Sequence, residues 1–329
     1  MVFLLFFIAA IFTVLSAIKL STYADVLSER TSLGGMLVGT IFLAGATSLP
    51  EVTTTLTAIV GLKNTDLAVG SVLGSNMFNL LIIAAFDLYY RKNQIFKSAS
   101  HSHVYTISVG MLLSCLIFLA LTLKLPYSIL GIGFDTIILI IIYASGMYLI
   151  SKKVTNFEDE DEDKDGVSQT SAISLKKAII GFIIAAFVIL ISGSLLSITG
   201  DRIAIVTGLG SSFVGSFLIA ASTSLPEAVA VLIAIQLRNY NLAIGSILGS
   251  NLFNILILIG SDVFYRPASI LSAASSVHSI TAIATFLLSV IILYSLLRSK
   301  VQKNQTVYWL PSAVLIFFYF VSSFLIFIN

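Results

Sequence analysis

The sequence predicts an all-α polytopic membrane protein with ten transmembrane helices, arranged as two inverted five-helix repeats. Two observations lead to this fold class. Of the 329 residues, 57% are apolar and only 10% are charged, whereas a soluble domain carries about a quarter charged residues. Long apolar runs also recur along the whole chain, and its two halves carry the same polar motifs. A soluble enzyme is therefore excluded, and the expected surroundings are a lipid bilayer.

The individual spans follow from the length rule that a membrane helix needs about 20 mainly apolar residues. The first run begins at Val2 without a basic n-region or a small-residue cleavage site, so we expect a span and not a signal peptide. The single cysteine, Cys115, lies inside an apolar run and offers neither a disulfide framework nor a cysteine-based zinc site. The expected spans are residues 2–20, 33–60, 67–89, 103–122, 126–150, 178–198, 208–236, 242–262, 276–297 and 307–328.

Basic residues set the predicted orientation of these spans. All 18 lysines and arginines can be assigned to the connections between the spans, and 14 of them fall on the odd-numbered connections. Because basic residues favour the cytoplasmic side, the odd connections should lie inside and both termini outside. The net charge of +2 argues neither for nor against nucleic acid, and we expect no nucleic-acid partner.

One connection, about residues 151–175, is longer and far more acidic than the others. It contains the run Glu158–Asp163, which is too polar to pack and predicts a solvated cytoplasmic linker. The linker separates a first half, residues 1–150, from a second half, residues 176–329.

The two halves are copies of each other. Residues 39–51 read GTIFLAGATSLPE and residues 215–227 read GSFLIAASTSLPE, 176 positions apart. Residues 67–79 read LAVGSVLGSNMFN and residues 242–254 read LAIGSILGSNLFN, 175 positions apart, which implies one deletion between the two motifs in the second copy. Because five spans is an odd number, the second copy enters the membrane from the opposite side. Such inverted repeats are typical of secondary transporters with a site near the midplane.

The first motif of each copy places a proline and a carboxylate in the middle of a span. Pro50 and Pro226 each remove a backbone N–H, which frees carbonyls in the preceding turn near Thr47 and Thr223. Free carbonyls and the adjacent Glu51 and Glu227 are costly in hydrocarbon unless they line a cavity or hold a ligand. The alternative explanation is a structural kink in which the glutamate is hydrogen-bonded. Repetition of the whole TSLPE block in both halves makes this alternative weaker. Hard oxygen ligands suit Ca²⁺ and Na⁺, and two glutamates would neutralise one divalent cation.

The second motif adds hydroxyl and amide groups on one helix face. Ser75 and Asn79 are four residues apart and share a face, as do Ser250 and Asn254. Glycines on that face, such as Gly70 and Gly74, permit close approach to a neighbouring helix, so tight packing is an equal explanation for them. Buried amides require hydrogen-bonding partners, which favours a role near the ions.

With TSLPE and GSNxFN each present twice, the chain resembles the calcium/cation antiporter superfamily, most closely its prokaryotic Na⁺/Ca²⁺ exchangers. The resemblance spans nearly the whole chain, with signature motifs at about residues 39–79 and 215–254. It implies an eight-helix core and two long tilted helices, spans 1 and 6, that slide across it. It also implies Ca²⁺ binding by Glu51 and Glu227 together with backbone oxygens of Thr47 and Thr223. The remaining implied ligands, mainly for sodium, are Ser48, Ser75, Ser224, Ser250, Asn79, Asn254 and the carbonyls of Ala44 and Ala220.

The chain departs from the family pattern at three pairs of positions. Ala46 and Ser222 stand where family members usually carry glycine, which bears on the local backbone and hence on ion selectivity. Ser71 and Ser246 stand where Asn is usual. Many relatives have Asp at the position of Asn254, so the amide argues against a potassium requirement.

Other polar residues receive no transport role from the sequence. His103 and His278 are expected at membrane boundaries, where interfacial histidines are common. Asp135 is more readily explained by a structural hydrogen bond than by ion binding. Four acids towards span ends are expected to be solvated or to cap helices: Asp25, Asp87, Asp201 and Asp262.

The predicted function is therefore Na⁺/Ca²⁺ antiport by alternating access, usually extruding Ca²⁺. The alternatives are Ca²⁺/H⁺ (or other cation) antiport and, with less support from the inverted duplication, a cation channel. We expect no enzymatic activity and no cofactor, because Ca²⁺ and Na⁺ are the transported ions. The expected location is a prokaryotic cell (inner) membrane, and the sequence leaves the oligomeric state open.

Overall fold

The computed structural model describes residues 1–30, 45–129, 131–158, 173–266, 268–301 and 308–329. Within these ranges, eight helices are long and apolar enough to cross a membrane, and a bent pair, residues 211–223 and 225–236, supplies a ninth span if it counts as one. A polytopic helical membrane protein is thus confirmed. The second expected span, residues 33–60, lies partly outside the described ranges, so ten spans are not established. The long helices are α1 (Val2–Arg30), α4 (Thr65–Tyr89), α5 (Ser102–Leu123), α6 (Phe134–Glu158), α7 (Leu175–Thr207), α11 (Tyr240–Phe264), α13 (His278–Val301) and α14 (Leu310–Ile328).

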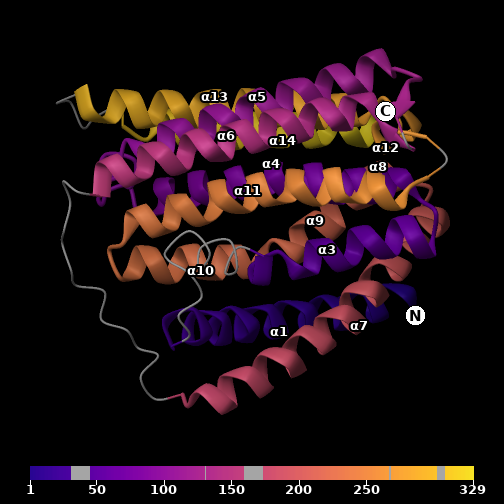
Figure 1. Cartoon of the computed structure of the whole chain (residues 1–329), viewed down its shortest axis with the longest axis horizontal. Coiled ribbons are helices and arrows are strands. Elements are labelled where there is room, and N and C mark those ends of the chain that lie inside the picture. Colours follow the sequence, from indigo (N-terminus) through magenta and orange to yellow (C-terminus); the bar gives the residue numbers. More distant parts are fainter. Residues whose placement is uncertain (31–44, 130, 159–172, 267, 302–307) are drawn as a thin grey trace.

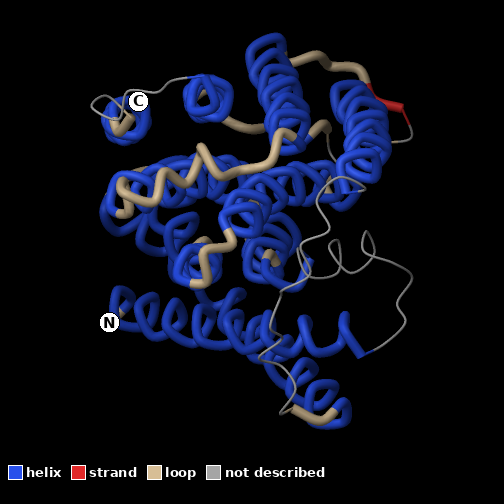
Figure 2. The backbone as a smooth tube through the Cα atoms, turned by 90° about the vertical axis from the view of Figure 1, so that its left-hand side faces the viewer, coloured by secondary structure: helices blue, strands red, loops and turns tan. Residues whose placement is uncertain are grey.

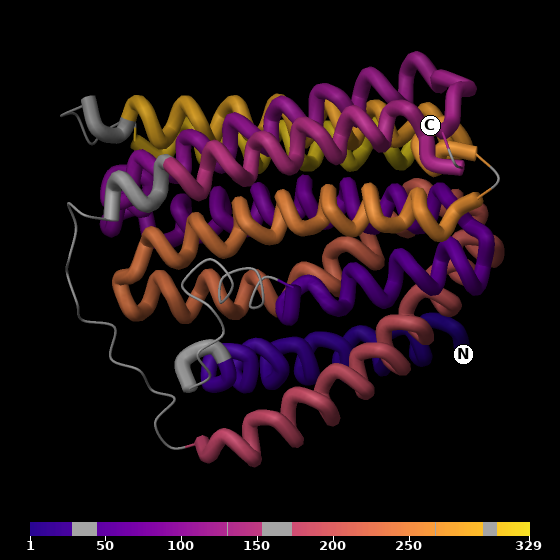
Figure 3. The backbone as a smooth tube through the Cα atoms, in the orientation of Figure 1, coloured from indigo at the N-terminus to yellow at the C-terminus, as the bar shows by residue number. Residues whose placement is uncertain are grey.

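Helices α4 and α11 run side by side through the middle of the molecule (Figure 3). On one side of them lie α5, α6, α13 and α14, and on the other side lie shorter helices (Figure 1). The shorter helices of the described chain are α3 (Leu49–Leu56), η1 (Thr57–Gly61), α8 (Ser211–Phe213), η3 (Val214–Ile219), α9 (Ala220–Thr223), α10 (Leu225–Gln236) and α12 (Ile270–Ala273). Of these, α3, α9 and α10 are labelled on this second side in Figure 1. In the most apolar 18-residue stretch of α4, 89% of the residues are buried, whereas the corresponding share for α1 is 22%. The centre of the fold is therefore the α4–α11 pair, which carries the second motif of each repeat.

Helices α1 and α7 form a separate outer layer, in which α7 crosses α1 obliquely (Figures 1 and 2). They contain 29 and 33 residues, so the expected limits 2–20 and 178–198 were too short. Lys19 and Arg202 consequently lie on exposed faces of helices and not in connections. The apolar count misplaced them because long basic side chains can rest their stems on apolar surface while the charge reaches water.

The fifth span begins later than the sequence predicted. Residues 126–150 were expected to be helical, but β1 (Ser128–Ile129) pairs antiparallel with β2 (Ile132–Gly133) before α6 starts at Phe134. Gly131 has φ +80°, a left-handed conformation that glycine adopts without strain, in the turn between the strands. Helix α6 also continues to Glu158, past residue 151. The rest of the acidic linker, residues 159–172, lies outside the described residues.

Both ends of the chain lie at the same end of the helical bundle (Figure 1). An even number of membrane crossings, such as the ten that the sequence predicts, would place them so. The side of the membrane on which the termini lie stays a prediction from the distribution of basic residues.

The two prolines break their spans in the same way. Pro50 and Pro226 each occupy the first turn of a helix, α3 and α10, where a missing N–H costs nothing. The preceding residues Ser48 (φ −88°, ψ 11°) and Ser224 (φ −89°, ψ 0°) interrupt the helix with nearly identical dihedral angles. The sequence prediction of a break at each TSLPE motif is therefore confirmed.

The extra residue in the first repeat is absorbed by a π-helical turn, η1. The N–H of Leu62 bonds to the carbonyl of Thr57, five residues back, whereas the equivalent Leu237 bonds to Ile233, four residues back. A π-turn holds one more residue than an α-turn. This turn explains why the two motifs are offset by different numbers of residues.

Candidate ion-binding site

The two helix breaks lie against the central helix pair. Helix α3 contacts α4, α9 and α11, while α4 also contacts α9 and α10 contacts α11. Each break therefore faces helices of both repeats. Tight packing supports this arrangement in one place, because a Cβ atom on Gly74 would clash with the carbonyl oxygen of Ser216. The expected close approach of the α4 glycines is thus confirmed, with η3 as the neighbour.

The two glutamates of the breaks are buried and close to each other. Glu51 and Glu227 are each 1% exposed, and their carboxylates are close enough to interact electrostatically. Glu51 lies close to Thr223 of the opposite repeat. The Thr223 hydroxyl in turn lies 3.3 Å from the Ser75 hydroxyl. Two like charges at one buried site are unfavourable without a cation or protons between them.

Around this pair, buried oxygen atoms occur in repeat-related couples. In the part of the chain that the structure describes, one side-chain oxygen of each of six predicted ligands has no hydrogen-bond partner, and all six residues are at most 1% exposed. Buried polar atoms in proteins are almost always paired. These six oxygens occur in repeat-related pairs, and carboxylate, hydroxyl and amide oxygens are the donor types that a hard cation prefers. They belong to Ser48 and Ser224, Glu51 and Glu227, and Asn79 and Asn254.

The amides of Asn79 and Asn254 are held across the repeats. The Nδ2 of Asn79 donates to Asn251 Oδ1 at 2.9 Å, and the Nδ2 of Asn254 donates to Asn76 Oδ1 at 3.0 Å. With both nitrogens occupied in this way, the oxygens are the ends left for an ion. Asn76 and Asn251 belong to the second motif of each repeat, but no role was predicted for them. Asn76 and Asn251 are 175 positions apart, as Asn79 and Asn254 are, and this matched offset is the signal that could have indicated a role.

The remaining predicted ligands are placed as follows. Thr47 is 6% exposed at the first break and Ser250 is 2% exposed on α11. The carbonyl of Ala220 accepts bonds from Ser224 N at 3.0 Å and Thr223 Oγ1 at 3.3 Å, so it is engaged within its own helix. Ala44 lies outside the described residues.

His103 and His278 each lie at the start of a long helix, as the sequence predicted, and both are buried inside the protein. His278 is fully buried and its Nε2 lies 3.3 Å from Asp66 Oδ1, while its ring packs over Gly70. His103 is 9% exposed and packs over Gly245, the equivalent glycine of the second repeat. The neighbouring central helices α4 and α11 pack against these histidines, so nearness to the start of a span did not mean exposure.

The acids outside the site have structural partners. Asp135 accepts from Ser269 Oγ at 2.8 Å, as the sequence predicted. Asp87 and Asp262 were expected to be solvated or to cap helices, but they are buried and bind other segments. Asp87 accepts from Tyr308 Oη and from Ser312 Oγ, each at 2.6 Å. Asp262 accepts from the backbone N–H groups of Gly133 at 2.8 Å and Ile270 at 2.6 Å, which ties the α11 end to its neighbouring loops.

Comparison with known proteins places this arrangement in a family. Two stretches of the chain, residues 1–152 and 177–328, match the family described as sodium/calcium exchanger protein. The chain belongs to the sodium/calcium exchanger family. It is therefore a member of the calcium/cation antiporter superfamily, whose role is cation exchange and not enzymatic catalysis.

Two curated relatives of this exchanger are similar over most of its length. The putative antiporter CaxA of Alkalimonas amylolytica is 26% identical over 86% of each chain. The inner membrane protein YrbG of Escherichia coli (strain K12) is 26% identical over 81% of this chain and 80% of its own.

Two solved structures share the fold. The H⁺/Ca²⁺ exchanger CAX matches with a TM-score of 0.66 at 14% identity, covering 98% of this chain and 87% of its own. The sodium-calcium exchanger NCX_Mj matches with a TM-score of 0.58 at 17% identity, covering 98% of both chains. The fold is thus common to exchangers that are named for different coupling ions.

Proposed function

We propose that this exchanger is a secondary antiporter that moves Na⁺ against Ca²⁺ by alternating access, usually extruding Ca²⁺. The observation that carries the proposal is the set of six buried, unpartnered side-chain oxygens in three repeat-related pairs. Their two carboxylates match the charge of one Ca²⁺, and oxygen ligands are those that Ca²⁺ prefers. The inverted duplication supports alternating access, because two similar halves can exchange inward-open and outward-open shapes.

Sodium is the favoured coupling ion because of the neutral ligands. The hydroxyls of Ser48, Ser75, Ser224 and Ser250 carry neither charge nor a proton that titrates at neutral pH. Their chemistry suits small monovalent cations that share the carboxylates once Ca²⁺ has left. Ca²⁺/H⁺ exchange is the second candidate, since Glu51 and Glu227 could bind two protons in place of one Ca²⁺. The solved structures share only the fold with this chain and do not choose between the two ions.

The deciding experiment compares two gradients across the same membrane. Purified protein in proteoliposomes should accumulate ⁴⁵Ca²⁺ when an outward Na⁺ gradient is imposed, with the membrane potential held by an ionophore. An imposed pH gradient at equal Na⁺ should give no uptake above protein-free vesicles. Uptake that follows only the pH gradient would identify a Ca²⁺/H⁺ antiporter. Flux that needs no counter-gradient and never concentrates Ca²⁺ would identify a channel.

The protein is an integral multi-pass membrane protein, and we propose the cell membrane of a prokaryote, the inner membrane where there are two. The similar protein of Escherichia coli, an inner membrane protein by name, supports this location. The expected orientation has both termini outside, on the strength of the basic residues in odd-numbered connections.

A further inference from the structure

Each predicted amide ligand is oriented by an asparagine of the opposite repeat. A carboxamide has a donor end and an acceptor end, so fixing its nitrogen also fixes the direction of its oxygen. Asn254 donates to Asn76 at 3.0 Å and Asn79 donates to Asn251 at 2.9 Å. If either amide turned over, its NH₂ group would face the cation, which cannot accept a hydrogen bond. An acceptor at positions 76 and 251 therefore selects the orientation that can bind an ion.

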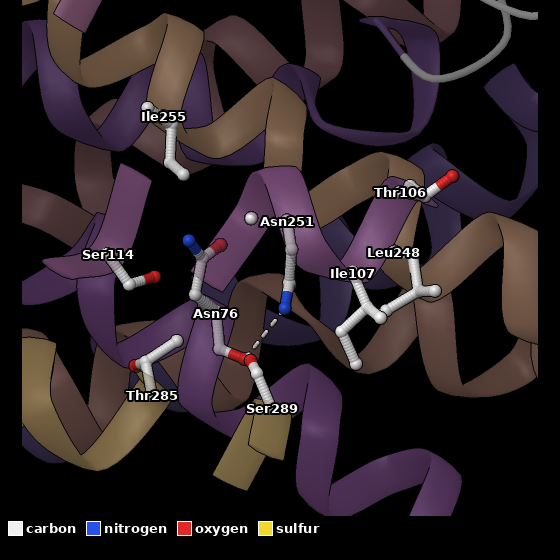
Figure 4. Close-up of a pocket in the computed structure, with 10 residues that line it drawn as sticks. Asn76, Thr106, Ile107, Ser114, Leu248, Asn251, Ile255, Thr285 and Ser289 are labelled. Carbon is white, nitrogen blue, oxygen red and sulfur yellow. Dashed lines mark hydrogen bonds between the residues drawn. The ribbon is translucent and has the colours of Figure 1, made fainter. Parts of the chain in front are cut away.

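One of the two orienting asparagines, Asn251, is itself held by the backbone of the other. Asn251 Nδ2 donates to the backbone carbonyl of Asn76 at 3.2 Å, which joins the central helices α4 and α11 directly. Both side chains line a small pocket between α4, α5, α11 and α13 (Figure 4). Hydroxyls of Ser114 and Ser289, which are equivalent in the two repeats, form part of the same lining. The asparagines thus stand between this pocket and the amide ligands.

We propose that Asn76 and Asn251 are positioning residues for ion binding. Asn76 holds the amide of Asn254 and Asn251 holds the amide of Asn79, each with its oxygen available to the ion. The inference rests on the proposed function, in which Asn79 and Asn254 are ligands. Its distinctive feature is that the coupling crosses between repeats. Sequence proximity would instead pair Asn76 with Asn79, three residues along the same helix.

A double-mutant cycle tests this crossed pairing. We would measure the ⁴⁵Ca²⁺ dissociation constant of the full-length, detergent-solubilised protein by equilibrium dialysis. Asn76→Leu should weaken Ca²⁺ binding on the order of tenfold, from loss of a buried polar contact. In the background of Asn254→Ala the same change should have little further effect, because no amide remains to be oriented. In the background of Asn79→Ala the two effects should multiply, since that amide depends on Asn251.

A conservative variant and a control separate positioning from folding. Asn76→Asp keeps an acceptor oxygen for Asn254 and should restore most of the affinity lost in Asn76→Leu. Ser289→Ala changes the same pocket without touching the amide pairs and should bind Ca²⁺ as the wild type does. Size-exclusion chromatography reports folding, so all dissociation constants refer to monodisperse protein.

The outcomes divide clearly between the two claims. Wild-type protein that binds no Ca²⁺ would overturn the proposed function and this inference with it. Wild-type binding combined with unchanged affinity in folded Asn76→Leu would overturn the positioning role alone. Non-additivity between Asn76 and Asn79, with additivity between Asn76 and Asn254, would show that the crossed pairing is wrong. If Asn76→Leu does not fold, failure of Asn76→Asp to bind Ca²⁺ would count against the inference in the same way.

Discussion

The hydroxyl oxygens of Ser75 and Thr223 lie 3.3 Å apart, although the residues are 148 positions apart and belong to opposite repeats. Ser75 lies on the central helix of the first repeat, and Thr223 lies at the helix break of the second. Because Thr223 also lies close to Glu51, one threonine of the second repeat neighbours both a hydroxyl and a carboxylate that the first repeat supplies. A change in the relative position of the repeats would therefore alter the ligand set directly.

Neutralising either glutamate should abolish calcium exchange. Glu51→Gln or Glu227→Gln leaves one carboxylate in a site of low dielectric, where it cannot balance a divalent cation. The measurement is Na⁺-driven ⁴⁵Ca²⁺ uptake by proteoliposomes. Asp66→Asn is the matched control: it removes an acid away from the site, keeps an oxygen for the Ser275 N–H, and reproduces Asn241 of the second repeat. Normal uptake by either glutamate variant would refute the assigned ligands.

Removing a hydroxyl from the proposed site should weaken Na⁺ binding more than Ca²⁺ binding. Ser75→Ala or Ser250→Ala deletes one of several neutral ligands, with an expected cost of about 1–3 kcal/mol. Competition of Na⁺ against ⁴⁵Ca²⁺ binding should therefore require higher Na⁺, while the Ca²⁺ affinity changes less. Ser71→Ala, one turn earlier on the same helix, is the control. Equal loss of Na⁺ and Ca²⁺ affinity would contradict a sodium role for these serines.

The buried Asp87 should make Tyr308 and Ser312 important for stability. Each donates to one carboxylate oxygen at 2.6 Å, so Tyr308→Phe or Ser312→Ala leaves a buried acceptor unpaired, at a cost of about 1–3 kcal/mol. Burial raises the pKa of Tyr308, and the nearby Asp87 raises it further. The contribution of the Tyr308–Asp87 hydrogen bond to the stability of the fold should accordingly persist below about pH 10 and decline at higher pH.

The test of this bond is thermal unfolding in detergent, followed by tryptophan fluorescence or by loss of monodispersity. Both variants should have a lower Tm, while exchange per folded molecule stays as in the wild type. Tyr127→Phe, a change at an exposed tyrosine, should leave the Tm unaltered. A Tm drop of the same size in Tyr127→Phe would show that the effect is unrelated to Asp87.

Gly74 should not tolerate even one added methyl group. A Cβ atom there would clash with the carbonyl oxygen and the Cα atom of Ser216, so the backbone of η3 would have to move. Gly74→Ala is expected to reduce the yield of folded protein and to shift η3 away from α4. Gly110→Ala is the comparison, because its Cβ would meet Leu252 at an ordinary 3.9 Å. Similar yields of the two variants would disprove the tight packing.

The acidic linker should be dispensable for turnover. Neither repeat includes it, and its composition cannot form a core. Replacing residues 158–165 by a neutral flexible segment of equal length should preserve the maximal rate of exchange in proteoliposomes. Loss of transport by a variant that remains monodisperse would assign the linker an essential part.

The features that could be predicted from the sequence are those that depend on a residue and its immediate neighbours in the chain. Pro50 and Pro226 break their helices because proline lacks an N–H, and this holds in any surroundings. The hairpin before Phe134 was missed because a short apolar run fits a strand and a helix equally well. The burial of His278 and Asp87 could not be predicted, because their partners Asp66 and Tyr308 are far away in the chain. The crossed Asn pairs likewise depend on how α4 packs against α11, which the motif spacing does not reveal.

The π-turn at Thr57–Gly61 shows where this membrane helix accepts a change of length. One residue added to a continuous α-helix rotates everything beyond it by about 100°, which would turn apolar faces inward and ligands outward. Here the wider turn takes up the surplus residue, and Asn64 caps α4 as Asn239 caps α11. Equivalent side chains before and after this turn therefore face the same directions in the two repeats, although the first repeat is one residue longer here. This turn is the place where one residue can be removed or retained without reorienting the ion ligands on either side.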